Sequence, residues 1–256
     1  MQVTVVSHAG IANRIKNILS AMSQYDVSTK HETINYLFPS IPLEEDPSRI
    51  YPEDWRLVVT PEEEKYCDPY KTIDLLYEKT PEYFIEKYLG VLGKIKINPE
   101  IIEFVSEFTD AWDDMVGVHI RSWYCPKKVF HSNEIFEKEI DKLPKDKKFF
   151  FCADNSDVQQ HFIQKYGDRV VCYDREIFNN PQLAESGHHD NIQLTADALI
   201  ELLILSKCAT IIGTYLSSFD EVAWWMGGCK SKVIIPTPIN CDEELEKFNN
   251  LIYVEK

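Results

Sequence analysis

From residue 113 onward, short apolar runs alternate with segments of helical periodicity, and only short links separate them. The apolar runs are MVGVHIR (115–121), KFFFCAD (148–154), RVVCYD (169–174), ATIIGT (209–214) and KVIIP (232–236). The helices expected between them cover residues 132–143, 156–166, 193–208 and 218–227. Continuous apolar strands that alternate with helices indicate a parallel sheet covered on both faces. We therefore predict an α/β lobe with a Rossmann-like parallel sheet over residues 113–256.

The first 112 residues predict a second, more compact α/β lobe. Its expected elements are a strand at 2–6, a helix at 11–22, strands at 33–38 and 55–60, and helices in EYFIEKYLGVL and NPEIIEFVSEF. Gly10 forms the turn between the first strand and the first helix. The chain is therefore predicted to have two lobes, residues 1–112 and residues 113–256.

Polar and basic residues follow the carboxyl ends of the predicted strands. Ligands of parallel sheets bind at the carboxyl ends of the strands, so these residues are candidates for a binding site. The candidates are His119, Arg121, Asp154, Thr214, Ser217, Ser218 and Phe219 in the second lobe, and Gly10, Asn13 and Arg14 in the first.

His119 and Arg121 end the strand VGVHIR. Side chains alternate along a strand, so these two are expected on the same face. The guanidinium of an arginine binds two phosphate oxygens at once, which makes Arg121 a candidate for an anion site. Structural or surface roles are the alternative for both residues.

Asp154 stands between a buried strand and a helix, where it has two possible roles. As an N-cap it accepts a backbone N–H, a role that Asn155 or Ser156 can also fill. As a ligand residue its two oxygens match the adjacent N1 and N2 donors of guanine. The sequence leaves both roles open.

Residues 213–228, GTYLSSFDEVAWWMGG, combine a strand end, hydroxyl residues and a helix start. The free N–H groups and positive end of a helix favour phosphate there, and Ser217 and Ser218 add hydroxyl donors. Ser218 with Glu221 also fits a capping box, which is compatible with anion binding. Trp224 and Trp225 are expected to pack in the core rather than to bind sugar.

The remaining motifs are less specific. The glycine turn before Asn13 and Arg14 is neither a GxGxxG nor a P-loop motif, and Arg14 is either a cleft residue or a surface residue. The adjacent histidines of GHHDN (187–191) have no third ligand at a useful spacing, so we expect no metal.

Composition narrows the class of partner and the location. The net charge of −15 argues against nucleic-acid binding, so an anion site must rest on a few positioned cations and N–H groups. The seven cysteines contain no CxxC pair, and Cys152, Cys172 and Cys208 are expected as small buried hydrophobic residues. Without an apolar span or a signal-like N-terminus, the chain is expected in the cytoplasm.

Four segments occur in the order of a known family. They are GIANR (10–14), VGVHIR (116–121), the step from Ala153 to Asp154, and residues 193–228. Together they resemble the α-1,6-fucosyltransferases, which include the nodulation fucosyltransferases and the mammalian core enzyme, and more loosely the protein O-fucosyltransferases.

This resemblance implies a GT-B-like pair of lobes with GDP-fucose bound mainly by the second. It implies an inverting transfer of fucose to a glycan hydroxyl, with no metal and no cofactor beyond the donor. By the same resemblance Arg121 binds the diphosphate, His119 and Asp154 lie against the guanosine, and Ser217 and Ser218 hold phosphate oxygens. Arg14 reaches the diphosphate from the first lobe.

The chain departs from the family after HIR. Ser122 stands where the family continues with a second arginine or with Thr-Asp, and the following stretch CPKKVFHS has no carboxylate to serve as base. His131 is the nearest candidate base and Glu134 the nearest carboxylate. Two alternatives follow: a transferase that uses another nucleotide sugar, or a GDP-sugar-binding protein without catalysis.

Overall fold

The chain divides into two compact units in a computed structural model that describes residues 2–6, 10–13, 15–16, 33–37, 82–93, 97–122, 132–175, 177, 192–214 and 217–236. One unit takes in Met1–Asp74, Thr80–Phe108 and Leu183–Ile200, and the other takes in Leu75–Lys79, Thr109–Gln182 and Glu201–Lys256. The lobe boundary expected after residue 112 stays a prediction.

The first unit contains a pair of parallel strands, β1 (Gln2–Val6) and β2 (Thr33–Leu37), in register from Gln2 opposite Thr33 to Val6 opposite Leu37. Residues 11–13 and 15–16 are helical, as the sequence predicted, whereas the strand expected at 55–60 lies outside the described residues. The two predicted amphipathic helices are α3 (Glu82–Leu92) and α4 (Pro99–Thr109).

The start of α4 follows from its first residues. Oδ1 of Asn98 accepts a hydrogen bond from the N–H of Glu100 at 2.9 Å, so Asn98 caps the helix. Pro99 occupies the first helical position, where its missing N–H would have no partner within the helix. Ile101 and Val105, four residues apart, form the buried side.

The second unit is built on a five-stranded sheet in the order β5-β4-β3-β6-β7, and every recorded pairing is parallel. The strands are β3 (Val116–Ile120), β4 (Phe149–Ala153), β5 (Val170–Val171), β6 (Thr210–Ile212) and β7 (Lys232–Ile234). The predicted parallel sheet is therefore confirmed. The strand expected at 169–174 is much shorter: a 3₁₀ turn at Gly167–Arg169 precedes it, and residues 172–174 are not in a strand.

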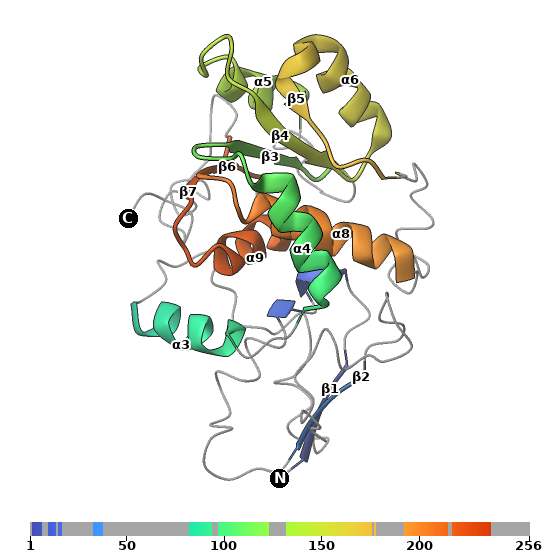
Figure 1. The fold of residues 1–256 in the computed structure, drawn as a ribbon, viewed down its shortest axis with the longest axis vertical. Coiled ribbons are helices and arrows are strands. Elements are labelled where there is room, and N and C mark those ends of the chain that lie inside the picture. Colours follow the sequence, from blue (N-terminus) through green and yellow to red (C-terminus); the bar gives the residue numbers. More distant parts are fainter. Residues whose placement is uncertain are drawn as a thin grey trace. The chain divides into compact units, whose positions relative to one another are not determined.

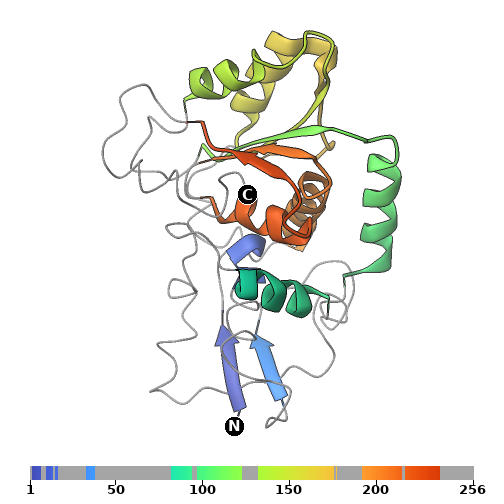
Figure 2. The same ribbon diagram turned by 90° about the vertical axis from the view of Figure 1, so that its left-hand side faces the viewer.

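Helices cover both faces of this sheet, as expected (Figures 1 and 2). One face carries α5 (Asn133–Ile140) and α6 (Ser156–Tyr166). The other carries α9 (Ser218–Met226) and the end of α8 (Ile192–Leu205). Ser132 is the N-cap residue of α5, as predicted, although its side chain makes no capping hydrogen bond.

Alternate residues of β3 face these two layers. Val118 and Ile120 belong to a fully buried cluster with Phe136 of α5 and Phe162 of α6. On the opposite face, a Cβ added to Gly117 would lie only 2.5 Å from Cδ1 of Leu205 at the end of α8. The glycine therefore allows α8 to pack close to the sheet, while the other face is filled by aromatic side chains.

The strand order places a topological switch point between β3 and β6. The chain runs outward from β3 through β4 to β5, and then returns to β6 and β7 on the other side of β3. Loops that leave the carboxyl ends of the two central strands run in opposite directions and open a crevice there. This fold therefore brings residues 119–122 and 213–214 to the position where such sheets bind ligands.

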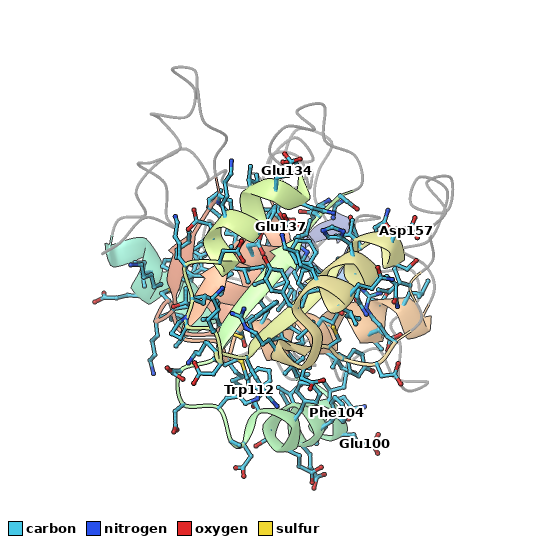
Figure 3. All side chains as sticks on the ribbon, turned by 90° about the horizontal axis from the view of Figure 1, so that it is seen from above. Glu100, Phe104, Trp112, Glu134, Glu137 and Asp157 are labelled. Atoms are coloured by element: carbon cyan, nitrogen blue, oxygen red, sulfur yellow. The ribbon has the colours of Figure 1, made fainter. Side chains whose placement is uncertain are left out.

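Glu137 of α5 joins two basic side chains of α6; Figure 3 labels this residue on its helix. Its Oε1 lies 2.6 Å from Nε2 of His161, and its Oε2 lies 2.6 Å from Nζ of Lys165. Burial by itself raises the pKa of the Glu137 carboxyl, but the hydrogen bonds and charges of His161 and Lys165 outweigh it. The pKa therefore lies below its ordinary value of 4.5.

We expect Glu137→Gln to lower the melting temperature at neutral pH, because ion pairs worth about 0.5–1 kcal/mol are lost. A carboxyl with a lowered folded-state pKa stabilises the protein above its unfolded-state pKa, and this stabilisation disappears as the pH falls through the folded value. Thermal unfolding followed by circular dichroism should therefore show the melting temperatures of the wild type and Glu137→Gln becoming equal below about pH 4. Glu134→Gln, at an exposed position of the same helix, is the control, and a pH-independent difference would contradict the prediction.

The described cysteines are free thiols. Cys152 and Cys208 are buried, as predicted, whereas Cys172 is half-buried. Burial raises the pKa of the Cys152 and Cys208 thiols, and burial together with the charge of Glu201 raises the pKa of Cys172 to about 12. These thiols are therefore poor nucleophiles at neutral pH.

None of the helices in the described part of the chain is both long and apolar enough to cross a membrane.

Candidate functional site

The centre of the candidate site is a buried pair formed by His119 of β3 and Asp220 of α9. Nδ1 of His119 lies 2.7 Å from Oδ1 of Asp220. Asp220 is 0% exposed and His119 is 6% exposed. The ring of Phe219 stacks on the imidazole, with 4.6 Å between the ring centroids. The imidazole is therefore held both at one edge and on one face.

Thr214 connects this pair to the ends of both central strands. Its N–H donates to Oδ2 of Asp220 at 2.7 Å, and its hydroxyl donates to the carbonyl of His119 at 2.8 Å. The same hydroxyl accepts the N–H of Arg121 at 2.9 Å. The ends of β3 and β6 and the first turn of α9 therefore share one hydrogen-bonded network. It includes three predicted site residues, His119, Arg121 and Thr214, together with Asp220.

The N-terminus of α9 opens at this network. Ser217 is the N-cap, and its hydroxyl oxygen accepts the N–H of Phe219 at 3.3 Å. The expected capping box of Ser218 and Glu221 is therefore wrong. Ser218 is the first helical residue. Glu221 lies on the buried side of α9, where its Oε1 accepts the indole N–H of Trp225 at 3.4 Å. A cap one residue earlier leaves the start of the helix accessible, because Ser218 and Phe219 are only half-buried.

Arg121 follows β3 directly and is exposed, whereas the next residue, Ser122, is fixed to Asp154. Oδ1 of Asp154 accepts the N–H of Ser122 at 2.7 Å and its hydroxyl at 2.8 Å. Asp154 therefore joins the end of β4 to the end of β3. The backbone at Arg121 is therefore fixed on both sides. Its own N–H is bound to Thr214, and the next residue, Ser122, is bound to Asp154.

The capping role left open for Asp154 belongs to its neighbour. Asn155 is the N-cap of α6, and its Oδ1 accepts the N–H groups of Asp157 at 2.8 Å and Val158 at 3.3 Å. The half-buried Asp154 carboxylate is turned to the β3 loop instead. This assignment removes the capping alternative, and the role of Asp154 in ligand binding stays a prediction.

A second basic side chain lies at the end of β4. Nη2 of Arg175 donates to the carbonyl of Ala153 at 3.0 Å and lies 2.8 Å from Oε2 of Glu201. Both side chains of this ion pair are largely buried. Sequence reasoning did not single out Arg175, because it follows the short β5 rather than one of the central strands.

The other predicted residues lie outside the second unit or outside the described residues. Gly10 and Asn13 belong to the first unit, and both are half-buried. Arg14, His131 and the GHHDN segment lie outside the described residues. Their roles stay predictions. Within the part of the chain that is described, no cluster of three or more His, Cys, Asp or Glu residues is placed to hold a metal ion.

No family model matches this sequence, and no curated protein is significantly similar to it. Solved structures do match. A structure of NodZ α-1,6-fucosyltransferase soaked with GDP-fucose has a TM-score of 0.56 at 17% identity, covering 87% of this chain and 91% of that one. The fucosyltransferase NodZ from Bradyrhizobium has a TM-score of 0.55 at 16% identity, covering 86% and 91%. NodZ co-crystallised with GDP has a TM-score of 0.56 at 17% identity, covering 86% and 90%.

The chain has the fold of the α-1,6-fucosyltransferases. The α/β, GT-B-like class predicted from the sequence is therefore confirmed, together with the predicted resemblance to this family in fold. In this fucosyltransferase fold, Trp224 and Trp225 pack as expected: both are buried, with their rings edge to face and 5.0 Å between the centroids.

One residue of the network, Asp220, was missed in the sequence. Asp220 is the third helical residue of α9, where an acidic side chain is ordinarily explained by the helix dipole alone. The available signal was Gly213, because a Cβ there would lie 2.8 Å from Cγ of Asp220. A glycine that ends an apolar strand just before Thr214 indicates that another group approaches the backbone closely.

Proposed function

We propose that this chain is a glycosyltransferase that transfers fucose from GDP-fucose to a glycan hydroxyl, with inversion and without a metal ion. The observation that carries the proposal is the network through which His119, Arg121 and Thr214 meet the N-terminus of α9 at the switch point of the sheet. The NodZ structures with GDP-fucose and GDP support the choice of donor, because they have the same fold.

The diphosphate is assigned to Arg121 and the start of α9. The protein carries a net charge of −15, so the overall field opposes the binding of an anionic donor. The exposed guanidinium of Arg121 can bind two phosphate oxygens, and the first turn of α9 offers N–H groups with the positive end of the helix dipole. Ser217 and Ser218 line that turn. Such fixed donors stabilise the charge that develops on GDP as the sugar leaves.

The guanine base is assigned to Asp154. Its carboxylate is oriented by two hydrogen bonds from Ser122 and lies at the end of β4, next to the diphosphate position. The two oxygens of a carboxylate match the paired N–H donors of guanine, which uracil lacks, and guanine would take the place of one of the Ser122 hydrogen bonds on Oδ1. His131 remains the candidate base for the acceptor hydroxyl, since residues 123–131 include no carboxylate.

Titration calorimetry with GDP, GDP-fucose and UDP tests the proposal. We expect micromolar binding of GDP and GDP-fucose, about −8 kcal/mol, and binding of UDP weaker by about tenfold or more. Product analysis by mass spectrometry with a panel of GDP-sugars then identifies the donor. Absence of GDP binding to the folded protein would remove the proposal.

A GDP-sugar-binding protein without catalysis is the second candidate. The stretch WYCPKKVFH after Ser122, which has no carboxylate, favours it. This candidate predicts GDP-fucose binding with no fucose transfer and no donor hydrolysis. Slow hydrolysis that disappears in a His131→Ala variant would exclude it, because hydrolysis requires a base that activates water.

A further inference from the structure

The two oxygens of Asp220 have separate tasks. Oδ2 accepts the backbone N–H of Thr214 at 2.7 Å, and Oδ1 lies 2.7 Å from Nδ1 of His119. An ionised carboxylate has only acceptor sites, so the hydrogen in the second contact belongs to Nδ1. A neutral imidazole that carries its hydrogen on Nδ1 has a lone pair on Nε2.

The surroundings of the imidazole favour this arrangement. Phe219 covers one ring face at a centroid distance of 4.6 Å, and the carbonyl of His119 is tied to Thr214. Asp220 itself is 0% exposed and is packed against Gly213, where a Cβ would come within 2.9 Å of Oδ2. The carboxylate and the ring are therefore both closely packed in this arrangement.

We propose that Asp220 is a positioning residue that holds His119 in the Nδ1–H tautomer, so that Nε2 accepts a hydrogen bond from a hydroxyl or N–H group of the bound ligand. This inference deepens the proposed function and depends on it for the identity of the ligand. Phosphate oxygens carry no hydrogen in the bound diphosphate, so His119 contacts the ribose, the base or the sugar. The diphosphate is left to Arg121 and the start of α9.

The tautomer is tested on the free protein by nitrogen-15 NMR of histidine-labelled chain, with the His119 signals assigned from their absence in His119→Gln. We expect Nδ1 to carry the hydrogen in the wild type. In Asp220→Asn the amide oxygen keeps the fixed N–H of Thr214, and the amide NH₂ then faces His119. The hydrogen is expected to move to Nε2, as it does when the carboxylate of a catalytic triad becomes an amide.

Asp157→Asn is the matched control, because Asp157 also lies in the first turn of a helix and is exposed; Figure 3 labels it on α6, which covers the other face of the sheet from α9. An Nε2–H form, a tautomer mixture or an imidazolium in the wild type at neutral pH overturns the proposal. An unchanged tautomer in folded Asp220→Asn overturns it as well. If the variant does not fold, the wild-type spectrum alone decides.

Binding of GDP tests the ligand contact separately. We expect Asp220→Asn to weaken GDP binding by about tenfold or more where Nε2 accepts an N–H, since a donor then meets a donor, and by much less where it accepts a hydroxyl, which can turn to accept instead. Asp157→Asn should change GDP binding by less than about twofold. Equal GDP affinity in wild type and Asp220→Asn, with the tautomer switched, overturns a contact between His119 and an N–H of the ligand. Failure of the wild type to bind GDP removes the proposed function but leaves the NMR result to decide the role of Asp220.

Discussion

Arg121→Ala is expected to weaken GDP binding by about 10- to 100-fold, because hydrogen bonds to a charged partner contribute about 1.5–3 kcal/mol each. Transfer should fall further, since the guanidinium also stabilises charge that develops only as GDP departs. The fold should not change, because the side chain is exposed and the hydrogen bond to Thr214 uses the backbone N–H. Calorimetry with GDP and steady-state kinetics with GDP-fucose measure the two effects.

Arg121→Lys separates charge from geometry. Lysine keeps the positive charge but lacks the planar fork that binds two oxygens at once, so its GDP affinity should lie between those of the wild type and the alanine variant. A lysine variant equal to the wild type would show that charge alone matters. An alanine variant that binds GDP normally would contradict the assignment of the diphosphate to Arg121.

Gly213→Ala is expected to affect stability and binding together. The new Cβ would lie 2.8 Å from Cγ and 2.9 Å from Oδ2 of Asp220, a carboxylate that is 0% exposed and bonded at both oxygens. Overpacking of this kind costs about 1–3 kcal/mol, and moving the carboxylate also releases His119. Thermal unfolding should show a lower melting temperature, and GDP affinity should fall by about tenfold or more.

Two further variants control this result. Gly90→Ala on α3 places a Cβ where no atom lies within 4 Å, so it should not lower stability. Adding Gly213→Ala to Asp220→Ala should cost less than adding it to the wild type, because the carboxylate atoms at 2.8 and 2.9 Å are gone and only the Cβ of residue 220, at 3.1 Å, stays close. Additive losses in that double variant would mean that the glycine is required for backbone conformation rather than for the approach of Asp220.

Periodicity was sufficient to predict the layers of this fold. The helix predicted at 156–166 matches α6, Ser156–Tyr166, and the parallel sheet was inferred from runs such as FFFCA that are buried on both faces. The extent of β5 was not predictable in this way. RVVCYD has an apolar pattern, but the strand has only two residues: a 3₁₀ turn takes up Arg169, and residues 172–174 leave the sheet.

The part of the candidate site that lies at strand ends was predictable, because ligands of parallel sheets bind there. The part that depends on tertiary contacts between distant segments was not. The rule for strand ends found His119, Arg121 and Thr214, which share one network. The partner of His119 was missed because Asp220 is separated from it by about a hundred residues and its role depends on how α9 packs on β3. Arg14 and His131 remain predictions from the sequence.

The outer strands of the sheet also affect how this protein behaves at high concentration. β5 has two residues and β7 has three, so the sheet ends in strands that are almost too short to pair with anything beyond them. Long exposed edge strands recruit further chains through their unpaired backbone groups, and short ones limit that process. The five-stranded sheet therefore presents little template for sheet-to-sheet aggregation, even though its three inner strands are among the most apolar segments of the chain.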